Sequence, residues 1–368
     1  MNVSAIERAL ARHMSARDRS RMRRVAALAA RRGRRLWLVG GPVRDLLLGR
    51  AVTDVDLAID GAVQQVGRAV ARELGGRLVW HPRFSTAVIS FDVGRLDLVR
   101  TRTETYAAPA RLPRVRPAGI ARDLARRDFS INAMALEIRP RSCGELLDPF
   151  AGRADLDAGR LRVLHEASFA DDPTRVFRAA RFATRFGFRV EQRTHSWLLD
   201  SVSRGEPCRL SGERVAAELR HVLREGRPAA TMGLLARWEL GASWGAPATP
   251  GPRGVERLRH AARRMKAIRL GDRERVALLF ACAFHDLPRE TRLNIADRLR
   301  VMRVERRLLV SGPERVDEIL ARLSRADGHA GRAAICRAAN PPFLRLAALL
   351  ARSDDYTRIR PFLENDGT

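Results

Sequence analysis

Two groups of residues in the first sixth of the chain could do chemistry together. The stretch "LWLVGGPVRDLLLGRAVTDVDLAIDG" places the pair Gly40 and Gly41 ahead of two aspartates, Asp54 and Asp56. Glycines between a strand and a helix let backbone N–H groups approach a phosphate, and Arg44, one turn on, could reach the same anion. The two aspartates are predicted on one face of a strand, where a metal ion would relieve their repulsion. For the glycine pair alone, the alternative is an ordinary turn between a strand and a helix. For the aspartate pair alone, the alternative is a strand edge with solvated acids.

The local sequence predicts the elements that must position these groups. "RLWLVGG" and "DVDLAI" are typical of strands, and "PVRDLLLG" and "VQQVGRAVARELGG" of helices that end at glycine. "STAVISFDVGRLDLV" predicts two strands joined by a tight turn near Gly94. From about residue 150 the alternation largely disappears and helical spacing dominates, as in "SGERVAAELRHVLREG". The fold class is therefore predicted to be α+β, a mixed sheet with helices followed by an all-helical part.

We expect four segments along the chain. They are a basic helical lead-in (1–35), a head (36–150), a helical neck (151–225) and a helical body and tail (226–368). The Arg-rich lead-in could also be read as a transit peptide, but it contains Glu7 and Asp18, which favours a solvated helix. A Gly/Pro-rich loop or linker is predicted at 241–254.

Composition points to a polyanionic partner. The chain has 69 basic and 42 acidic residues and a net charge of +27, and its only lysine is Lys266. A GC-rich genome explains arginine in place of lysine but not the excess of bases over acids, which favours nucleic acid. No apolar run of about 18 residues is present, so no membrane span is expected. The four scattered cysteines fit thiols in a reducing cytoplasm rather than a zinc site or disulfide framework.

Three ordered stretches carry a resemblance to a known family. "GGPVRDLLLGRAVTDVDLAIDG", "ARDLARRDFSINAMAL" and "DDPTRVFRAARFATRFGF" resemble the motifs of polymerase-beta-type nucleotidyltransferases, in particular of class II CCA-adding enzymes and bacterial poly(A) polymerases. "SGERVAAELRHVL" resembles a fourth, less specific motif, and the match covers roughly 36–225. The resemblance implies a nucleotidyltransferase head with two Mg²⁺ ions at Asp54 and Asp56. Enzymes of this family also need a third carboxylate near the metal ions. Asp97 is our candidate for it, and Asp92 is the alternative.

The resemblance also implies nucleotide-binding residues outside the glycine pair. Arg127 would contact the nucleotide, and Asp128 would orient a neighbouring arginine. In the third motif, Asp172 and Arg175 would read the base, and Arg178 and Arg181 would support that pair or the phosphates. Asp172 before Pro173 is also typical of a helix N-cap, and Gly187 of a helix end.

An Asp–Arg pair has a definite chemical preference among bases. Cytosine and adenine present an amino donor beside a ring-nitrogen acceptor, whereas uracil and guanine present the reverse. A carboxylate accepts from the amino group and a guanidinium donates to the ring nitrogen. Such a pair would accept C and A and reject U and G.

We therefore predict template-independent addition of C-C-A to tRNA 3′ ends from CTP and ATP, in the cytoplasm, with pyrophosphate released. The tRNA acceptor end is the expected partner, gripped through its backbone by the arginine-rich helices. CC-adding, A-adding or poly(A) synthesis are alternatives of the same class, and a non-catalytic RNA-binding protein is one of another class. His285–Asp286 is interpreted as structural, without hydrolase activity. The sequence leaves the oligomeric state open.

Overall fold

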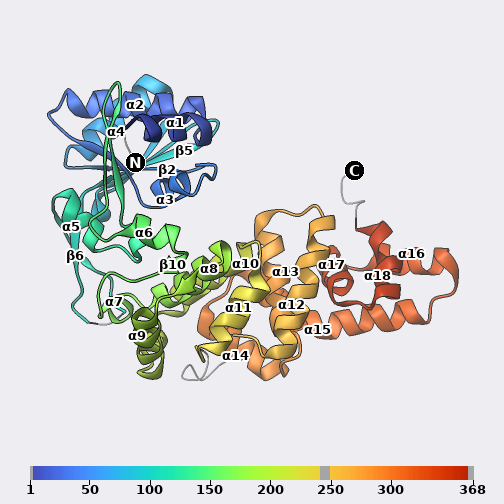
Figure 1. Ribbon diagram of the computed structural model, residues 1–368. Coiled ribbons are helices and arrows are strands. Elements are labelled where there is room, and N and C mark those ends of the chain that lie inside the picture. The colour runs from blue at the N-terminus through green and yellow to red at the C-terminus, as the bar shows by residue number, and fades with distance from the viewer. Residues whose placement is uncertain (1–2, 109, 241–248, 364–368) are drawn as a thin grey trace. The chain divides into compact units, whose positions relative to one another are not determined.

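The structure is a computed structural model that describes residues 3–108, 110–240 and 249–363 (Figure 1). The chain divides into two compact units. The first contains Met1–Asp171 and Arg189–His195, and the second contains Asp172–Phe188 and Ser196–Thr368. The predicted neck is shared between the two units, so the four-segment division by function stays a prediction. Most of the predicted loop at 241–254 lies outside the described residues.

A seven-stranded sheet forms the centre of the first unit, in the order β3-β4-β5-β2-β1-β8-β9. Its strands are β1 (Leu36–Val39), β2 (Val55–Ile59), β3 (Arg77–His81), β4 (Thr86–Ser90), β5 (Arg95–Arg100), β8 (Ala135–Ile138) and β9 (Cys143–Leu147). Strands β2 and β5 are parallel, and the other neighbours are antiparallel. The predicted mixed sheet is therefore confirmed. The all-apolar β1, with four buried residues, lies between β2 and β8 because only an interior strand buries both of its faces.

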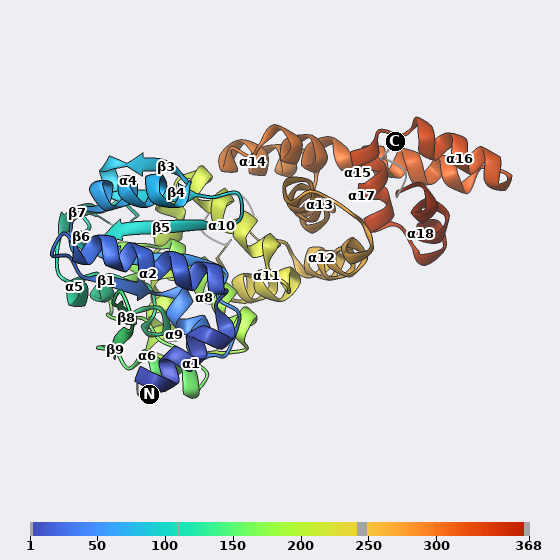
Figure 2. The ribbon, with the colours of Figure 1, turned by 90° about the horizontal axis from the view of Figure 1, so that it is seen from above.

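The two faces of this sheet have different coverings. Helices α2 (Ala16–Ala30) and α4 (Val63–Leu74) pack on one face, where Gly67 of α4 lies against Ala87 of β4 (Figures 1 and 2). The opposite face carries a buried cluster around Trp37 and Ala58, which includes Leu124 of α5 (Ile120–Ala125). Because side chains alternate along a strand, Asp56 shares this second face with Ala58.

The N-terminal segment is helical, as predicted, but it is not a solvated lead-in. Helix α1 (Val3–His13) buries Ile6 and Leu10, and it packs against β9 and against α3 (Gly41–Leu47). Helix α2 packs against α4 and the sheet. The prediction rested on the many charged residues of this segment. It overlooked the apolar residues that recur at helical spacing between the arginines and that form a buried face.

Smaller elements complete the first unit. Strands β6 (Arg102–Thr105) and β7 (Arg114–Pro117) form a separate antiparallel hairpin. Helices α6 (Gly152–Asp157) and α7 (Ser168–Asp171) follow β9, and the short strands β10 (Arg160–Leu161) and β11 (Arg189–Val190) pair in parallel. Helix α9 (Gln192–Ser203) begins in the first unit and ends in the second.

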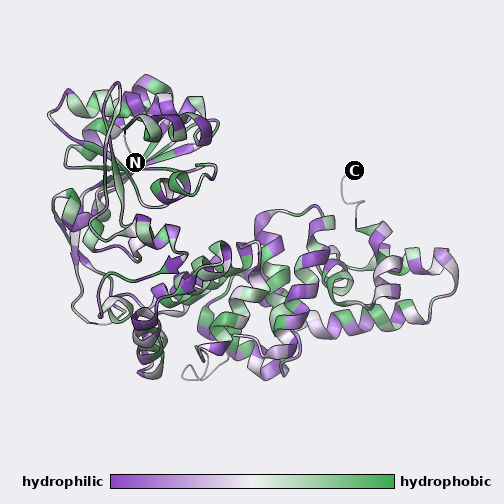
Figure 3. Cartoon of the chain, in the orientation of Figure 1, coloured by the Kyte–Doolittle hydropathy of each residue, from purple (hydrophilic) through white to green (hydrophobic). Residues whose placement is uncertain are grey.

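In the part of the chain that the structure describes, the second unit is built of helices apart from short turns. They are α8 (Thr174–Phe186), α10 (Gly212–Arg224), α11 (Pro228–Arg237), α12 (Pro252–Arg264), α13 (Asp272–Phe284), α14 (Arg289–Leu299), α15 (Arg303–Ser324), α16 (Gly328–Ala338), α17 (Pro341–Leu350) and α18 (Ser353–Ile359). Helix α13 is buried without interruption from Val276 to Phe284 and contacts α10, α12, α15 and α17. Figure 3 shows hydrophobic and hydrophilic residues alternating along the helices of this unit. It is the centre of this unit, and the predicted all-helical second part is confirmed. No described helix has the length and apolar character to cross a bilayer.

Candidate active site

The glycine pair forms the turn between β1 and α3. Gly40 has φ 71° and ψ −124°, a conformation that side chains strongly disfavour. A Cβ atom at Gly40 would overlap the guanidinium of Arg127. Its N–H donates to the carbonyl of Met134 at 3.1 Å. The glycine therefore serves close approach by an arginine, and its amide is already bonded, which the sequence prediction of a backbone phosphate cradle did not foresee.

Arg44 lies beside the pair but is held by its neighbours. The residue is 5% exposed, and its guanidinium lies 3.6 Å from the position of a Cβ on Gly41. It donates two hydrogen bonds to Asp45, both 2.9 Å long, and one of 2.7 Å to Oδ1 of Asn132. Arg44 thus contributes positive charge under the turn while its position is fixed by partners within the protein.

The carboxylates meet on the face of the sheet opposite α4. Asp56 of β2 and Asp97 of β5 are direct partners in the parallel register. Asp54 is exposed and immediately precedes β2. The prediction that it lies on the strand is therefore wrong by one residue. Asp92 is exposed in the turn between β4 and β5. Of the two candidates for a third carboxylate, Asp97 is the one that adjoins Asp56.

The electrostatics of this group indicate an unbalanced negative charge. Burial, together with the charges of Asp97 and Asp54, raises the pKa of Asp56 to about 6. Burial also raises the pKa of Asp97; Arg95, whose guanidinium donates to Asp97 at 3.1 Å, opposes this shift, and Asp54 adds to it. The other oxygen of Asp97 is buried without a hydrogen-bond partner. These are the properties expected of oxygen ligands to a hard cation.

A divalent metal ion fits this donor set, and Asp54, Asp56 and Asp97 would hold it. Among the described residues, no three acidic, histidine or cysteine side chains converge closely enough to form a complete site. Asp56 and Asp97 are register partners all the same, and one oxygen of Asp97 has no hydrogen-bond partner, as expected where a cation would bind between carboxylates that repel one another.

Helix α5 and the turn that follows it bring arginines to this face. Arg127 donates to Asp123 at 3.2 Å and to the carbonyl of Asn132 at 3.4 Å, and its charge lowers the pKa of Asp56. Its guanidinium therefore lies against the Gly40 turn and close enough to Asp56 to act on its charge, and its contact with the nucleotide stays a prediction.

Asp123, which the sequence analysis did not single out, holds both arginines of the second motif directly. Its carboxylate accepts from both Arg126 and Arg127. Asp128 accepts from the Phe129 N–H and from Nδ2 of Asn132, whose Oδ1 in turn accepts from Arg44. Asp128 is thus linked to Arg44 through Asn132, and its orienting of a neighbouring arginine stays a prediction. The sequence alone could not distinguish these two aspartates.

The proposed base-reading residues belong to the second unit. Helix α8 begins at Thr174 with Pro173 as its N-cap, one residue later than predicted, while Gly187 ends it in the left-handed conformation, as predicted. Asp172 still performs a capping role, because its Oδ1 accepts from the backbone N–H of Thr174 at 3.2 Å. Arg175 is only 4% exposed.

Two residues of α10 complete this group, and the sequence prediction missed them. Arg214 donates to Oδ1 of Asp172 at 2.8 Å. Glu218 faces Arg178 and Arg181, and burial raises its pKa despite these arginines. The Nη1 of Arg181 lies 3.6 Å from Oε2 of Glu218. The only sequence signal was the fourth motif, "SGERVAAELRHVL", which contains both residues.

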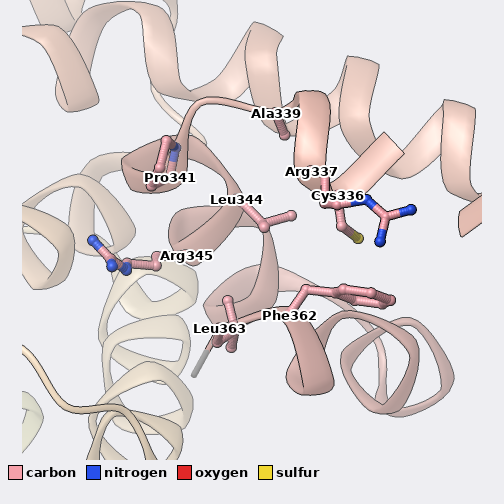
Figure 4. A pocket seen from close by; sticks show the side chains of 8 residues that line it. All are labelled: Cys336, Arg337, Ala339, Pro341, Leu344, Arg345, Phe362 and Leu363. Atoms are coloured by element: carbon pink, nitrogen blue, oxygen red, sulfur yellow. The ribbon is translucent and has the colours of Figure 1, made fainter. Parts of the chain in front are cut away.

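Two other features of the second unit are separate from these residues. His285 follows α13, where burial lowers its pKa, and Asp286 forms an ion pair with Arg257. The interpretation that the pair is structural stays a prediction. A pocket of 280 Å³ lies between α16, α17 and the C-terminal turn, with Leu344 pointing into it (Figure 4). None of the predicted site residues lines this pocket.

The first unit combines an acidic pair on a mixed sheet with a glycine turn, and the second unit is helical. Residues 36–162 match the poly A polymerase head domain. With the comparisons below, this match shows that the chain is similar to tRNA nucleotidyltransferases and contains a poly A polymerase head domain.

Individual relatives and a solved structure differ in how much of the chain they match. An A-adding tRNA nucleotidyltransferase of Halalkalibacterium halodurans is 42% identical over 217 residues, which are 58% of this chain and 51% of that protein. A CC-adding tRNA nucleotidyltransferase of Deinococcus radiodurans is 38% identical over 207 residues, 56% of this chain and 54% of its own length. The chain thus spans about half of each. A CCA-adding enzyme in an apo form has a TM-score of 0.80 at 28% identity, covering 97% of this chain and 85% of that structure.

Proposed function

We propose that this protein is an RNA nucleotidyltransferase that adds C-C-A to the 3′ ends of tRNA from CTP and ATP. The observation that carries the proposal is the alignment of Asp56 with Asp97 on one face of the sheet, with Arg127 against the Gly40 turn and acting on the charge of Asp56. Carboxylates and a fixed guanidinium at one place match the two demands of nucleotidyl transfer, which are metal binding and triphosphate binding.

In the proposed reaction, the 3′ hydroxyl of the RNA attacks the α-phosphorus of the nucleotide. A bond forms between O3′ and that phosphorus, the bond to the β-phosphate oxygen breaks, and pyrophosphate leaves as the hydroxyl gives up its proton. Asp54, Asp56 and Asp97 would bind two Mg²⁺ ions, which when bound favour the alkoxide form of the hydroxyl and neutralise the leaving pyrophosphate. Arg127 and the buried charge of Arg44 would orient the triphosphate.

Base choice is assigned to the second unit. Asp172 would accept from the amino group of cytosine or adenine, and Arg175 would donate to the adjacent ring nitrogen. The contacts of Asp172 support this role, because Arg214 and Thr174 fix its Oδ1 and thereby orient the carboxylate. The surplus of arginine suits the phosphate backbone of the tRNA acceptor end.

Addition of A alone is the second candidate. The A-adding relative at 42% identity favours it, whereas the CCA-adding structure that aligns with 97% of this chain favours complete C-C-A addition. We favour the complete activity because that alignment extends over both units, whereas the identity to the A-adding relative is measured over 58% of the chain.

Incorporation assays distinguish these outcomes. The protein is incubated with Mg²⁺ and tRNA transcripts that end before the tail, after one C or after C-C, with each NTP alone and together. We expect two C residues and one A, followed by arrest, and no incorporation by an Asp54→Ala, Asp56→Ala variant. Addition of A only to the C-C transcript would establish the A-adding activity. Absence of incorporation on every transcript would contradict the enzyme assignment.

A further inference from the structure

A buried carboxylate in the first unit divides its two oxygens between different arginines. Asp123 is fully buried. Its Oδ1 accepts from Arg126 at 2.8 and 3.1 Å and from the backbone N–H of Arg102 at 3.1 Å. Its Oδ2 accepts from Arg127 at 3.2 Å. Burial alone would raise the pKa of Asp123, but the charges of Arg126 and Arg127 outweigh it and the pKa is lowered, so the group is ionised near neutral pH.

A second carboxylate holds Arg126 from its other side. Glu104 lies on β6 of the hairpin, and its side chain is 8% exposed. Its Oε1 accepts from Arg126 at 3.0 Å and from Arg102 at 2.8 and 3.1 Å, while its Oε2 accepts from the hydroxyl of Tyr106. Arg126 therefore spans Glu104 and Asp123, and Asp123 spans Arg126 and Arg127.

We propose that Glu104 is a positioning residue for nucleotide binding, because it holds Arg126 on one oxygen of Asp123 and leaves the other oxygen to Arg127. A guanidinium prefers to bind a carboxylate through two parallel hydrogen bonds. Without the charge of Glu104, Arg126 turns to engage both oxygens of Asp123 and displaces Arg127. Arg127 then moves away from the Gly40 turn, where its guanidinium now lies against the glycine.

This inference rests on the proposed function only in taking Arg127 as a triphosphate ligand. It adds a residue that does not touch the nucleotide and that belongs to the hairpin rather than to the sheet. The hairpin thereby becomes part of the nucleotide site through three ion pairs, with the chain of contacts running from Glu104 to Arg126, Asp123 and Arg127.

A double-mutant cycle on nucleotide binding tests the inference. The dissociation constant of CTP in the presence of Mg²⁺ is measured by calorimetry for the wild type, Glu104→Gln, Arg127→Ala and the double variant. We expect Glu104→Gln to weaken CTP binding by about tenfold, and the double variant to lie within about twofold of Arg127→Ala, since residues that act through one another are not additive. In turnover with tRNA, Glu104→Gln should raise the KM for CTP with little change in kcat.

Glu137→Gln is the matched control. Glu137 also accepts from two arginines, Arg35 and Arg139, in the same unit, but it belongs to β8 and is not part of this chain of contacts. It should leave CTP binding unchanged. Thermal unfolding of each variant separates loss of fold from loss of positioning.

The other possible results distinguish failure of this inference from failure of the proposed function. Unchanged CTP binding in Glu104→Gln, or additive effects in the double variant, would overturn the inference while the proposed function stands. Non-additive CTP binding without incorporation into any tRNA would overturn the proposed function and retain the inference. A wild-type protein that does not bind CTP would contradict both.

Discussion

At the scale of single residues, Gly40 is under two constraints that reinforce each other. Its backbone conformation excludes most side chains, and Arg127 occupies the space that a Cβ would need. Gly75, at the end of α4, also has a positive φ of 68° but has no neighbour within 4 Å of a Cβ. The two glycines therefore separate backbone strain from displacement of the arginine.

We predict that Gly40→Ala lowers the free energy of unfolding by about 3 kcal/mol, against about 1 kcal/mol for Gly75→Ala. Gly40→Ala should also raise the KM for CTP by about tenfold, which is equivalent to ~1.4 kcal/mol, while Gly75→Ala leaves it unchanged. Urea unfolding and steady-state kinetics of both variants are the measurements. Equal effects of the two substitutions on KM would contradict the position assigned to Arg127.

Arg214 offers a residue-scale test of base selection. Its bond to Asp172 orients the carboxylate that is proposed to recognise the amino group of C and A. We predict that Arg214→Gln narrows the preference for CTP over UTP by about tenfold, since a carboxylate that is free to rotate discriminates less well (~1.4 kcal/mol). Arg220 lies on the same helix but pairs with Glu305. Arg220→Gln should lower stability and leave the preference intact; a loss of preference in both variants would show a general disturbance of α10.

At the scale of elements, the sequence predicted the parts whose ends are marked by glycine or proline and missed those that depend on distant partners. Strand β1, α3, β2, α4 and the β4–β5 turn at Gly94 were predicted because their apolar periodicity is local. Strand β3 was missed because it is an edge strand without a fully buried residue. The β6–β7 hairpin was missed because ion pairs stabilise it in place of an apolar face.

The candidate site likewise contains residues that the sequence identifies and residues that only tertiary contacts reveal. Asp56 and Gly40 could be found from spacing, whereas the partnership of Asp97 with Asp56 depends on a parallel pairing between strands separated by a helix and two further strands. Similarly, no local pattern indicates that Asp123 is shared by two arginines or that Arg214 reaches Asp172, since these contacts depend on tertiary packing. Sequence reasoning therefore identified candidate groups and could not supply the residues that hold them.

The pairing of α8 with α10 leads to a prediction about pH. Glu225, at the end of α10, accepts from Arg181 and Arg185 of α8. Burial would raise the pKa of Glu225, but the hydrogen bonds from Arg185 and Arg181 outweigh it, and the pKa is lowered. A lowered pKa means that the ionised form stabilises the fold above the ordinary glutamate pKa and that this contribution disappears as the pH falls through the lowered value.

We therefore predict that Glu225→Gln lowers the free energy of unfolding by about 2 kcal/mol at pH 7 and that the difference from the wild type shrinks as the pH falls below 4.5. Urea unfolding of both proteins across that range is the measurement. A difference that stays constant with pH would mean that Glu225 contributes by packing rather than by charge.

At the scale of the whole molecule, charge and aromatic content together indicate how RNA would be held. The net charge is +27, and aromatic residues make up 5% of the chain. Several rings of the second unit pack on one another, as Phe182 does with Phe186 and Phe280 with Phe284. With few rings and these four packed on one another, we expect contacts to phosphates to supply most of the affinity for RNA.

Affinity that comes from phosphates has a measurable signature in its salt dependence. If about six or more phosphates are neutralised, we predict that the Kd for tRNA weakens by roughly a thousandfold or more between 50 and 200 mM salt. The Asp54→Ala, Asp56→Ala variant should show the same slope while incorporating no nucleotide, because its substitutions remove metal binding and not phosphate contacts. A single-stranded RNA of equal length should bind more weakly than folded tRNA, since recognition depends on the fixed spacing of phosphates in a folded acceptor arm. A shallow salt dependence, or preference for the single strand, would show that base contacts dominate and that the arginine excess has another origin.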